Sequence, residues 1–356
     1  MPSPNDPICI VGNGATTAVG LNAAATAAAV RAGIDGFEEH PYLINQEGDP
    51  YVLAMVPSID ASLTGVDRYI AMSAPAIDEA LEPLQGIRQQ CELIAVVALP
   101  EKRPGLPDNL DKEIDRYILA QSTEHIVFRS TRTAFRGHAL GLMALETAGK
   151  LLAAKECEFC LVGGIDSYID PDTLDWVEEN EQFHFPSNAW GFIPGEAASF
   201  CLLCSTVTAH KYKLPVRVQL VTVSSAQEKN RIKTETICVG EGLTHAVRGA
   251  VAGLPEESKI DYTICDQNGE AYRADEYGFM LCRLAENFSD PSDYLAPADC
   301  WGDVGAASGS LYLSLLVVAA EKGYEKGPYS LLWASSEGGE RSAALIQTLV
   351  EQRRAV

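Results

Sequence analysis

Three features are scarce in this chain of 356 residues, and each scarcity excludes a class of protein. No run of eighteen apolar residues occurs, so the sequence predicts no transmembrane helix. Residues 1–6 contain neither a basic start nor an apolar stretch, so we expect no signal peptide and a cytoplasmic location. Lysine and arginine number 27 against 49 acidic residues, and the net charge of −22 argues against nucleic acid or membrane as a partner. Such a charge suits a basic protein partner or simply serves solubility.

Low-complexity tracts and short-period repeats are also absent. Cysteine is present, but no expected signal peptide would take the chain to an oxidising compartment. Ten cysteines in a chain with no expected signal peptide indicate reduced thiols. Two pairs, Cys157/Cys160 and Cys201/Cys204, have the spacing of zinc ligands. The second pair lies in an apolar strand, where residues three apart face opposite sides, so we interpret both as core packing. The sequence therefore predicts no metal and no cofactor.

What the chain does contain is an alternation of apolar strands and helices, which is typical of the α/β class. Two segments open in the same way, with a buried strand at 7–11 and another at 216–223, and 211–215 forms the connector. This pattern predicts two similar halves, 1–210 and 211–356. Further elements are expected at these positions: helices at 21–32, 67–84, 141–155, 243–253 and 305–321, and strands at 93–99, 159–163, 197–204, 260–265 and 329–334, the last closing the chain.

Four glycine-containing segments then appear in a fixed order along the chain, at Ile8–Gly20, Cys157–Ser167, Trp190–Ala198 and Gly302–Gly309. Together they resemble β-ketoacyl synthases of the thiolase superfamily, whose corresponding motifs read V-T-G-x-G, L-x-G-G-x-(D/E), D-G-F-V-x-G-E-G-A and G-H-x-x-A-A-A-G. The resemblance implies a thiolase-like fold with two similar halves in alternating α/β layers, and a dimer formed by edge strands. Residues 35–135 match poorly and are shortened relative to that family.

Four glycines of these segments come directly after buried strands: Gly12, Gly14, Gly163 and Gly164. We expect each of them either to make a turn with positive φ or to let another backbone approach closely.

The catalytic positions of the family are occupied by other residues. Its condensing cysteine begins a helix that reads C-x-x-G-L-x-A-L, and the matching run here begins with His138. The histidine of its G-H motif corresponds to Asp303. Its other histidine corresponds to Asp266, or to Asn268 if the register slips by two residues. The glycine-rich gate of the family reads SSEGGER at 335–341 and has no phenylalanine.

These replacements oppose the family's carbon–carbon bond formation. An imidazole donates a hydrogen bond to the developing enolate, whereas an aspartate would repel it by about 4 kcal/mol at 4 Å in an effective dielectric near 20. We therefore assign no confident catalytic residue. Three interpretations of His138 and the two aspartates stay open: a structural hydrogen bond that fills the old site, a His–Asp dyad for acyl transfer or hydrolysis, and a divalent-metal site.

Two functions follow from the resemblance. The first is a non-catalytic adaptor or co-chaperone that acts through protein interfaces, as in the stand-alone ketosynthase-like proteins of bacterial type VI secretion clusters, with an effector or adaptor as partner. The second is an acyl-handling enzyme with altered chemistry at His138, or the partner subunit of an active ketosynthase. The aromatic cluster at 183–192, which includes Trp190, is expected near the pocket mouth and provides either packing or a partner contact.

Overall fold

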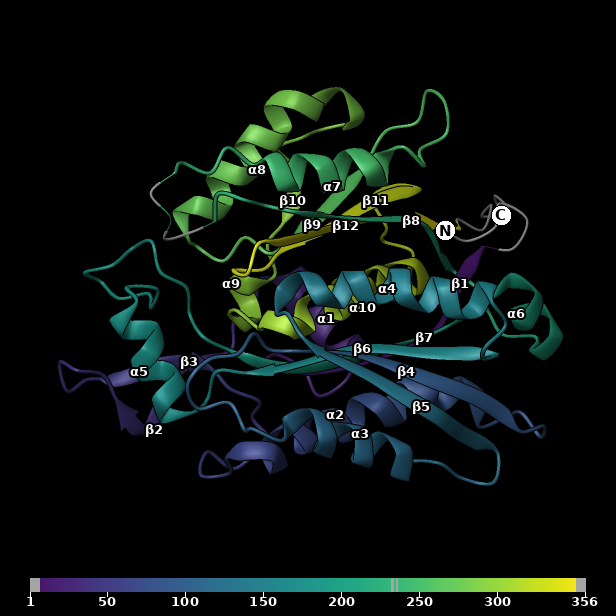
Figure 1. Cartoon of the computed structure of the whole chain (residues 1–356), viewed down its shortest axis with the longest axis horizontal. Coiled ribbons are helices and arrows are strands. Elements are labelled where there is room, and N and C mark those ends of the chain that lie inside the picture. Colours follow the sequence, from purple (N-terminus) through teal and green to yellow (C-terminus); the bar gives the residue numbers. More distant parts are fainter. Residues whose placement is uncertain (1–6, 232–233, 235, 350–356) are drawn as a thin grey trace.

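The computed structural model describes residues 7–231, 234 and 236–349. Residues 1–6, where no signal peptide was expected, lie outside the described part, as do the last residues of the predicted second half. The described residues contain one ten-stranded sheet, a separate two-stranded sheet, and helices on both faces of the large sheet (Figure 1). No helix within these residues has the length and apolarity needed to cross a membrane.

The first half of the chain supplies one half of the large sheet. Its strands are β1 (Ile8–Thr17), β4 (Cys91–Leu99), β5 (Ile126–Phe135), β6 (Phe159–Ser167) and β7 (Glu196–Ser205), and a hairpin of β2 (Phe37–Ile44) and β3 (Pro50–Ala54) stands apart. Its helices are α1 (Ala23–Ala32), α2 (Gly65–Leu81), α3 (Leu110–Ala120), α4 (His138–Ala153), α5 (Pro171–Glu179) and α6 (Thr206–Tyr212).

The second half repeats the plan. Its strands are β8 (Val218–Gln227), β9 (Tyr262–Cys265), β10 (Tyr294–Leu295), β11 (Tyr329–Ser335) and β12 (Glu340–Thr348). Its helices are α7 (Glu241–Val251), α8 (Ala271–Leu284), α9 (Ala298–Trp301) and α10 (Ser308–Lys322), with a 3₁₀ turn at Gly305–Ala307 before α10.

The two half-sheets have the same strand order and the same directions. The first runs β1-β7-β6-β4-β5 and the second β8-β12-β11-β9-β10. In each, the first two neighbouring pairs are antiparallel and the last two are parallel. The prediction of two similar halves is therefore confirmed, whereas the boundary between residues 210 and 211 stays a prediction.

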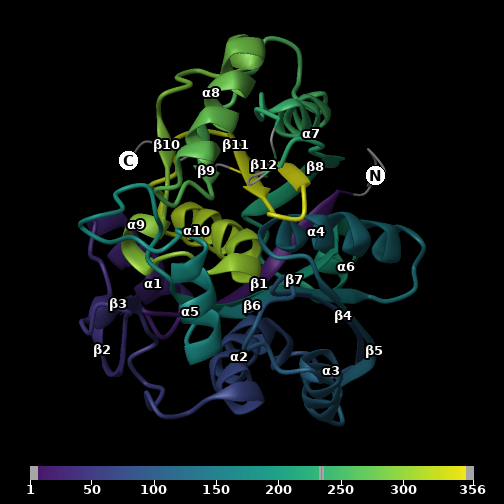
Figure 2. The same cartoon turned by 60° about the vertical axis from the view of Figure 1, so that its left-hand side comes forward.

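The elements form five layers, which Figures 1 and 2 show from two sides. Helices α7 and α8 cover one half-sheet, α2 and α3 cover the other, and α1, α4 and α10 lie between them. Helices α4 and α10 of the central layer cross closely at two glycines. A Cβ on Gly141 of α4 would lie only 3.0 Å from the Cα of Gly309 in α10. This close crossing fixes the start of α4 near the loop that precedes α10.

The glycines after the expected strands do not make turns. Strand β1 continues through Gly12 and Gly14, and β6 continues through Gly163 and Gly164. None of the four has a positive φ. The alternative reason, close approach of another backbone, is correct for Gly12, Gly14 and Gly164: a Cβ on Gly12 would lie 2.3 Å from the carbonyl oxygen of Ala80, and one on Gly164 would lie 2.0 Å from that of Ala306. At Gly163 the near neighbour is instead the ring of Phe200, at 2.1 Å.

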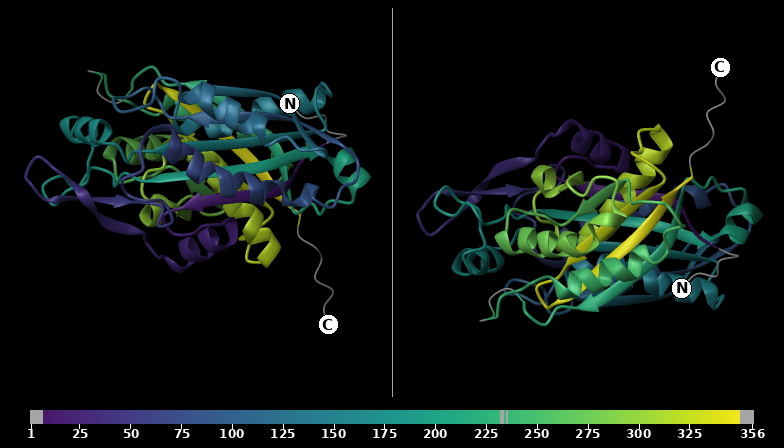
Figure 3. Two further views of the ribbon diagram at one scale, coloured as in Figure 1. Left: turned by 90° about the horizontal axis from the view of Figure 1, so that it is seen from below. Right: turned by 90° about the horizontal axis from the view of Figure 1, so that it is seen from above.

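Several elements were absent from the sequence-based expectation. The strand at 329–334 does not close the chain, because β12 follows it and pairs with both β11 and β8. Strand β5 was also missed, since its polar sequence IVFRSTRTAF lacks the apolar run that marked the other strands. The β2–β3 hairpin and α5 project together from one end of the molecule, as Figures 1 and 3 show.

The cysteine pairs lie where packing predicts. Cys201 and Cys204 are both buried in β7, and they belong to different apolar clusters on the two faces of the sheet. Cys157 follows the end of α4. A helix of 16 residues is about 24 Å long, so Cys157 lies far from the first residue of α4.

Candidate functional site

The site grows from the first residue of α4. Gly137, with φ of 63° and ψ of −145°, turns the chain out of β5 into the helix, and His138 is the first helical residue. The backbone N–H of Ala139, in the first turn of the helix, donates to Oγ of Ser336 at 2.9 Å, and Ser336 itself donates to the carbonyl of Arg136. The start of α4 is therefore held by the loop between β11 and β12.

His138 and Asp303 form a direct pair. Nε2 of His138 lies 2.8 Å from one carboxylate oxygen of Asp303 and 3.0 Å from the other. Both side chains are buried. Asp303 lies in the loop between α9 and α10, and its backbone pairs with Ile193 and Gly195, so the loop of the third glycine segment fixes the carboxylate in place.

Of the two residues that the sequence offered for the family's other histidine, Asp266 and Asn268, only Asn268 contacts Asp303 directly. Its side-chain amide donates to Asp303 at 2.6 Å and to Glu270 at 3.1 Å. Asp266 instead forms an ion pair with Arg273 at 2.6 Å and accepts from the backbone N–H of Ser335. The structure therefore brings His138, Asn268 and Asp303 into direct contact. Asp266 belongs to the neighbouring buried ion pair with Arg273.

Arg273 was not singled out from the sequence. Its guanidinium bridges Asp266 and Glu270 and also donates to the carbonyl of Ser335. It is 1% exposed, which is rare for an arginine unless carboxylates surround it. The only sequence signal is the three-residue spacing from Glu270, which is common on helix surfaces and therefore not diagnostic.

Burial and charge act in opposite directions on the pair. Burial disfavours the charged imidazolium, but the Asp303 carboxylate outweighs it and raises the pKa of His138 above its ordinary value. Burial likewise opposes ionisation of Asp303, yet the His138 charge, Arg273 and Asn268 hold the pKa of Asp303 well below its usual range. Burial raises the pKa of Asp266 in spite of Arg273.

Space next to His138 is small. A cavity of about 70 Å³ lies beside it, lined by Glu101, Arg103, Gly137, Tyr168, Trp176 and Phe192 among others. A water molecule takes about 30 Å³ in the liquid, so this volume holds about two of them. Small-molecule sites have volumes of about 300–1,000 Å³, and this cavity is several times smaller.

The arrangement does not suit the two chemical alternatives. A His–Asp dyad for acyl transfer or hydrolysis needs a nucleophile that gives its proton to the imidazole. Within the described ranges, no hydroxyl or thiol is hydrogen-bonded to His138. A cation is also disfavoured, because Arg273 already neutralises Asp266 and the imidazole, Asn268 and the Gly305 N–H surround Asp303. The geometry fits a filled, hydrogen-bonded site.

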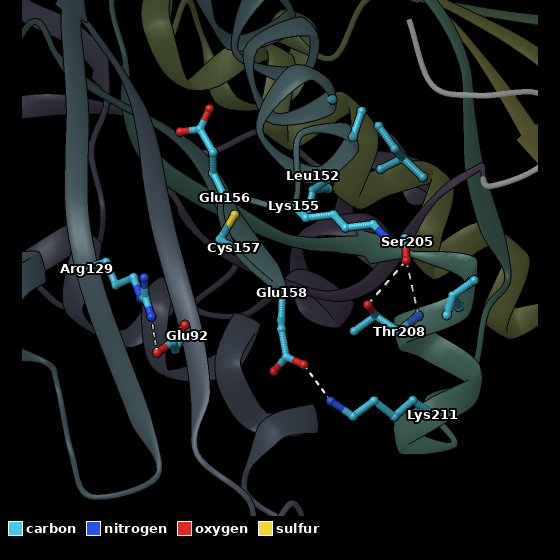
Figure 4. Close-up of a pocket in the computed structure, with 14 residues that line it drawn as sticks. Glu92, Arg129, Leu152, Lys155, Glu156, Cys157, Glu158, Ser205, Thr208 and Lys211 are labelled. Atoms are coloured by element: carbon cyan, nitrogen blue, oxygen red, sulfur yellow. Dashed lines mark hydrogen bonds and ion pairs between the residues drawn. The ribbon is translucent and has the colours of Figure 1, made fainter.

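A larger pocket lies at the opposite end of α4, as Figure 4 shows. Its volume is about 650 Å³, and it lies between the last turn of α4, the start of β5 and α6. Ion pairs join Glu92 to Arg129 and Glu158 to Lys211 across its wall (Figure 4). Cys157 lines this pocket, so the thiol that follows α4 is far from His138.

Comparison with known proteins shows relatives only at the level of structure. No family model and no curated protein sequence matches this chain. The fold is similar to that of the ishigamide ketosynthase/chain length factor, with a TM-score of 0.71 and 19% identity over 96% of this chain and 99% of that one. It is also similar to a chain of a type II PKS acyl-carrier protein complex with its hexaketide-bound ketosynthase, with a TM-score of 0.72 and 13% identity over 97% and 99%.

The ketosynthase from module 6 of the Bacillus subtilis 168 bacillaene synthase gives a TM-score of 0.74 and 14% identity, covering 97% of this chain and 73% of that one. At these identities the likeness concerns the fold. The chain therefore has the thiolase-like ketosynthase fold, as the four glycine segments predicted.

Proposed function

We propose that this protein is non-catalytic and works through protein–protein contacts on a ketosynthase scaffold. The observation that supports this most is the buried network at the start of α4, where His138 is engaged by Asp303 and Asp303 by Asn268. Condensation needs a free nucleophile and hydrogen-bond donors for the enolate. Here a carboxylate, that of Asp303, contacts the His138 ring, and the cavity that His138 lines has a volume of only about 70 Å³.

The test uses the intact chain with an acyl thioester and a malonyl thioester. We expect no acylated protein by intact-mass measurement and no β-ketoacyl product. His138→Cys should restore neither condensation nor decarboxylation, because Asp303 and Asn268 remain. Detection of an acylated chain, or of a β-ketoacyl product formed by the unmodified protein, would contradict the proposal.

A second candidate is the partner subunit of an active ketosynthase. It is favoured by the outer edge of β5, which pairs with no other strand among the described residues, and by the similarity to the ketosynthase/chain length factor over 96% of this chain and 99% of that one. Mixing with a ketosynthase encoded beside this chain, followed by native mass spectrometry, separates the two candidates. A heterodimer supports the subunit role. The adaptor role in type VI effector loading stays a prediction, and a neighbouring gene for a secretion effector would favour it.

A further inference from the structure

One projecting part of the molecule has an extreme charge. We define the acidic lobe as residues 37–54, which contain the β2–β3 hairpin, and residues 168–192, which contain α5. These two segments share a small apolar core and project from one end of the molecule (Figures 1 and 3). The first has four carboxylate side chains and the second six, and neither contains a lysine or an arginine.

The charges of the acidic lobe are not neutralised by ion pairs among the residues that the structure describes. Eight of the ten carboxylates are exposed. No described lysine, arginine or histidine forms an ion pair with any of the ten. Two others, Asp170 and Glu178, are half-buried and accept hydrogen bonds within the lobe. The surface therefore has a strong field of one sign, which acts over about 8 Å at physiological salt.

The hairpin also exposes apolar side chains on one face. Tyr51 and Leu53 of β3 are buried against the lobe core, so Val52 between them points outward. Cross-strand register puts Glu39 opposite Val52 and Ile44 opposite Pro50, on the same outer face. Ile44 is 59% exposed and nearby Tyr42 is 69% exposed. Nothing in the described chain covers this face.

The aromatic cluster at 183–192 was expected to provide either packing or a partner contact, and its members differ in burial. Phe183 and Phe192 are buried in the lobe core, whereas Trp190 is 69% exposed on the same lobe. Aromatic side chains are enriched at protein interfaces, and exposed apolar patches rimmed by polar residues mark interaction sites.

We infer that the outer face of the β2–β3 hairpin binds a basic segment of a partner protein, in which lysine or arginine alternates with aliphatic residues. The inference rests on the proposed function, since it names the chemistry of the partner. In an extended segment with this alternation, the aliphatic side chains can pack on Ile44 and Val52, and the segment lies along the outer face of the hairpin. The long stems of its lysine or arginine side chains let the cations bend back toward Glu39 on that face and toward the exposed Glu38, Glu47 and Asp49 around it. A second copy of this chain does not fit, because like charges would oppose each other.

The experiment measures the anisotropy of a fluorescein-labelled peptide of seven lysines alternating with seven leucines. We expect saturable binding to the intact protein that weakens between 50 and 300 mM salt. Glu38→Gln, Glu39→Gln, Glu47→Gln and Asp49→Asn combined should weaken binding at least tenfold. Ile44→Ser with Val52→Ser should also weaken it, and a lysine–serine peptide should bind less tightly than the lysine–leucine peptide.

A matched control separates this site from general attraction to an acidic protein. Asp108→Asn, Glu124→Gln, Glu256→Gln and Asp275→Asn remove the same four charges from exposed positions outside the lobe and change the net charge equally, from −22 to −18. Binding should stay within twofold of the unmodified protein. An equal loss of peptide affinity in the lobe variant and in the control variant would overturn the proposed binding site on the hairpin. Acyl-transfer activity, which would contradict the proposed function, is measured separately on the unmodified protein, so that failure of the proposed function and failure of this binding site can be told apart.

Discussion

The unusual feature at the residue scale is a buried ion pair at the start of α4. The side chains of His138 and Asp303 are 7% and 3% exposed, and Asp303 also accepts hydrogen bonds from Asn268 and from the backbone N–H of Gly305. Breaking a buried pair by removing one partner typically costs about 3–5 kcal/mol, because the remaining charge is left in a poorly polar environment. The pair is therefore expected to matter for stability even if it has no catalytic role.

The first prediction concerns this coupling. His138→Gln should lower the free energy of unfolding by about 3 kcal/mol, and Asp303→Asn should have a similar effect. The double variant should be less destabilised than the sum of the two, with a coupling of about 1–3 kcal/mol. Urea unfolding followed by circular dichroism measures all four proteins. Strict additivity would contradict a direct pair.

The second prediction is the pH dependence of the same pair. The folded pKa of His138 is raised from 6.5, so its contribution is fully present below pH 6.5 and is lost as pH rises through the folded value. The folded pKa of Asp303 is lowered from 3.8, so its contribution is present above that value and is lost on further acidification. The stability difference between the unmodified protein and His138→Gln should therefore be largest between about pH 4 and 6.5. A difference that stays constant from pH 5 to 9 would refute this assignment.

At the scale of elements, glycines act through packing rather than through turns. The strands were predicted to stop before Gly12 and Gly164, because a glycine after a buried run usually marks a turn. Instead, the missing Cβ atoms let α2 approach β1 and let the turn before α10 approach β6. Sequence pattern could reveal the apolar strands and helices of both halves. It could not reveal β5, whose edge position tolerates polar side chains, or Arg273, whose partners come together only after folding.

The third prediction follows from these contacts. Gly164→Ala should destabilise the protein by about 1–3 kcal/mol or more, because its Cβ would lie 2.0 Å from a backbone oxygen that cannot move away freely. Gly278→Ala in α8 is the matched control, since nothing lies within 4 Å of its Cβ position. That change should stabilise by about 0.4–1 kcal/mol. Thermal unfolding of both variants should show shifts of opposite sign.

At the scale of the whole molecule, the large sheet ends on one side at β5, which has no neighbour on its outer edge among the described residues. An open edge strand is a template for pairing with another chain. The sequence resemblance implied a dimer formed by edge strands, and β5 is the longer of the two sheet edges, with ten residues against two in β10.

The fourth prediction is a dimer through β5. Light scattering should give twice the chain mass of 38.3 kDa. Thr131→Glu with Thr133→Glu should give a monomer, because two facing β5 strands would then bring four carboxylates together. Ser58→Glu with Thr64→Glu adds the same charge at exposed positions outside the strand and should leave the dimer intact. A monomeric unmodified protein at micromolar concentration would rule out self-pairing at this edge.

The two half-sheets meet through three residue pairs, which join Ile8–Ile10 of β1 to Val218–Leu220 of β8. Every other strand pairing in the large sheet is internal to one half. A protease cut at 213–217 would therefore sever no strand, and the central helices would still hold the two pieces together. In mechanical terms the two halves are joined mainly by the packing of α4 and α10 against strands of both, and only to a small extent by the sheet.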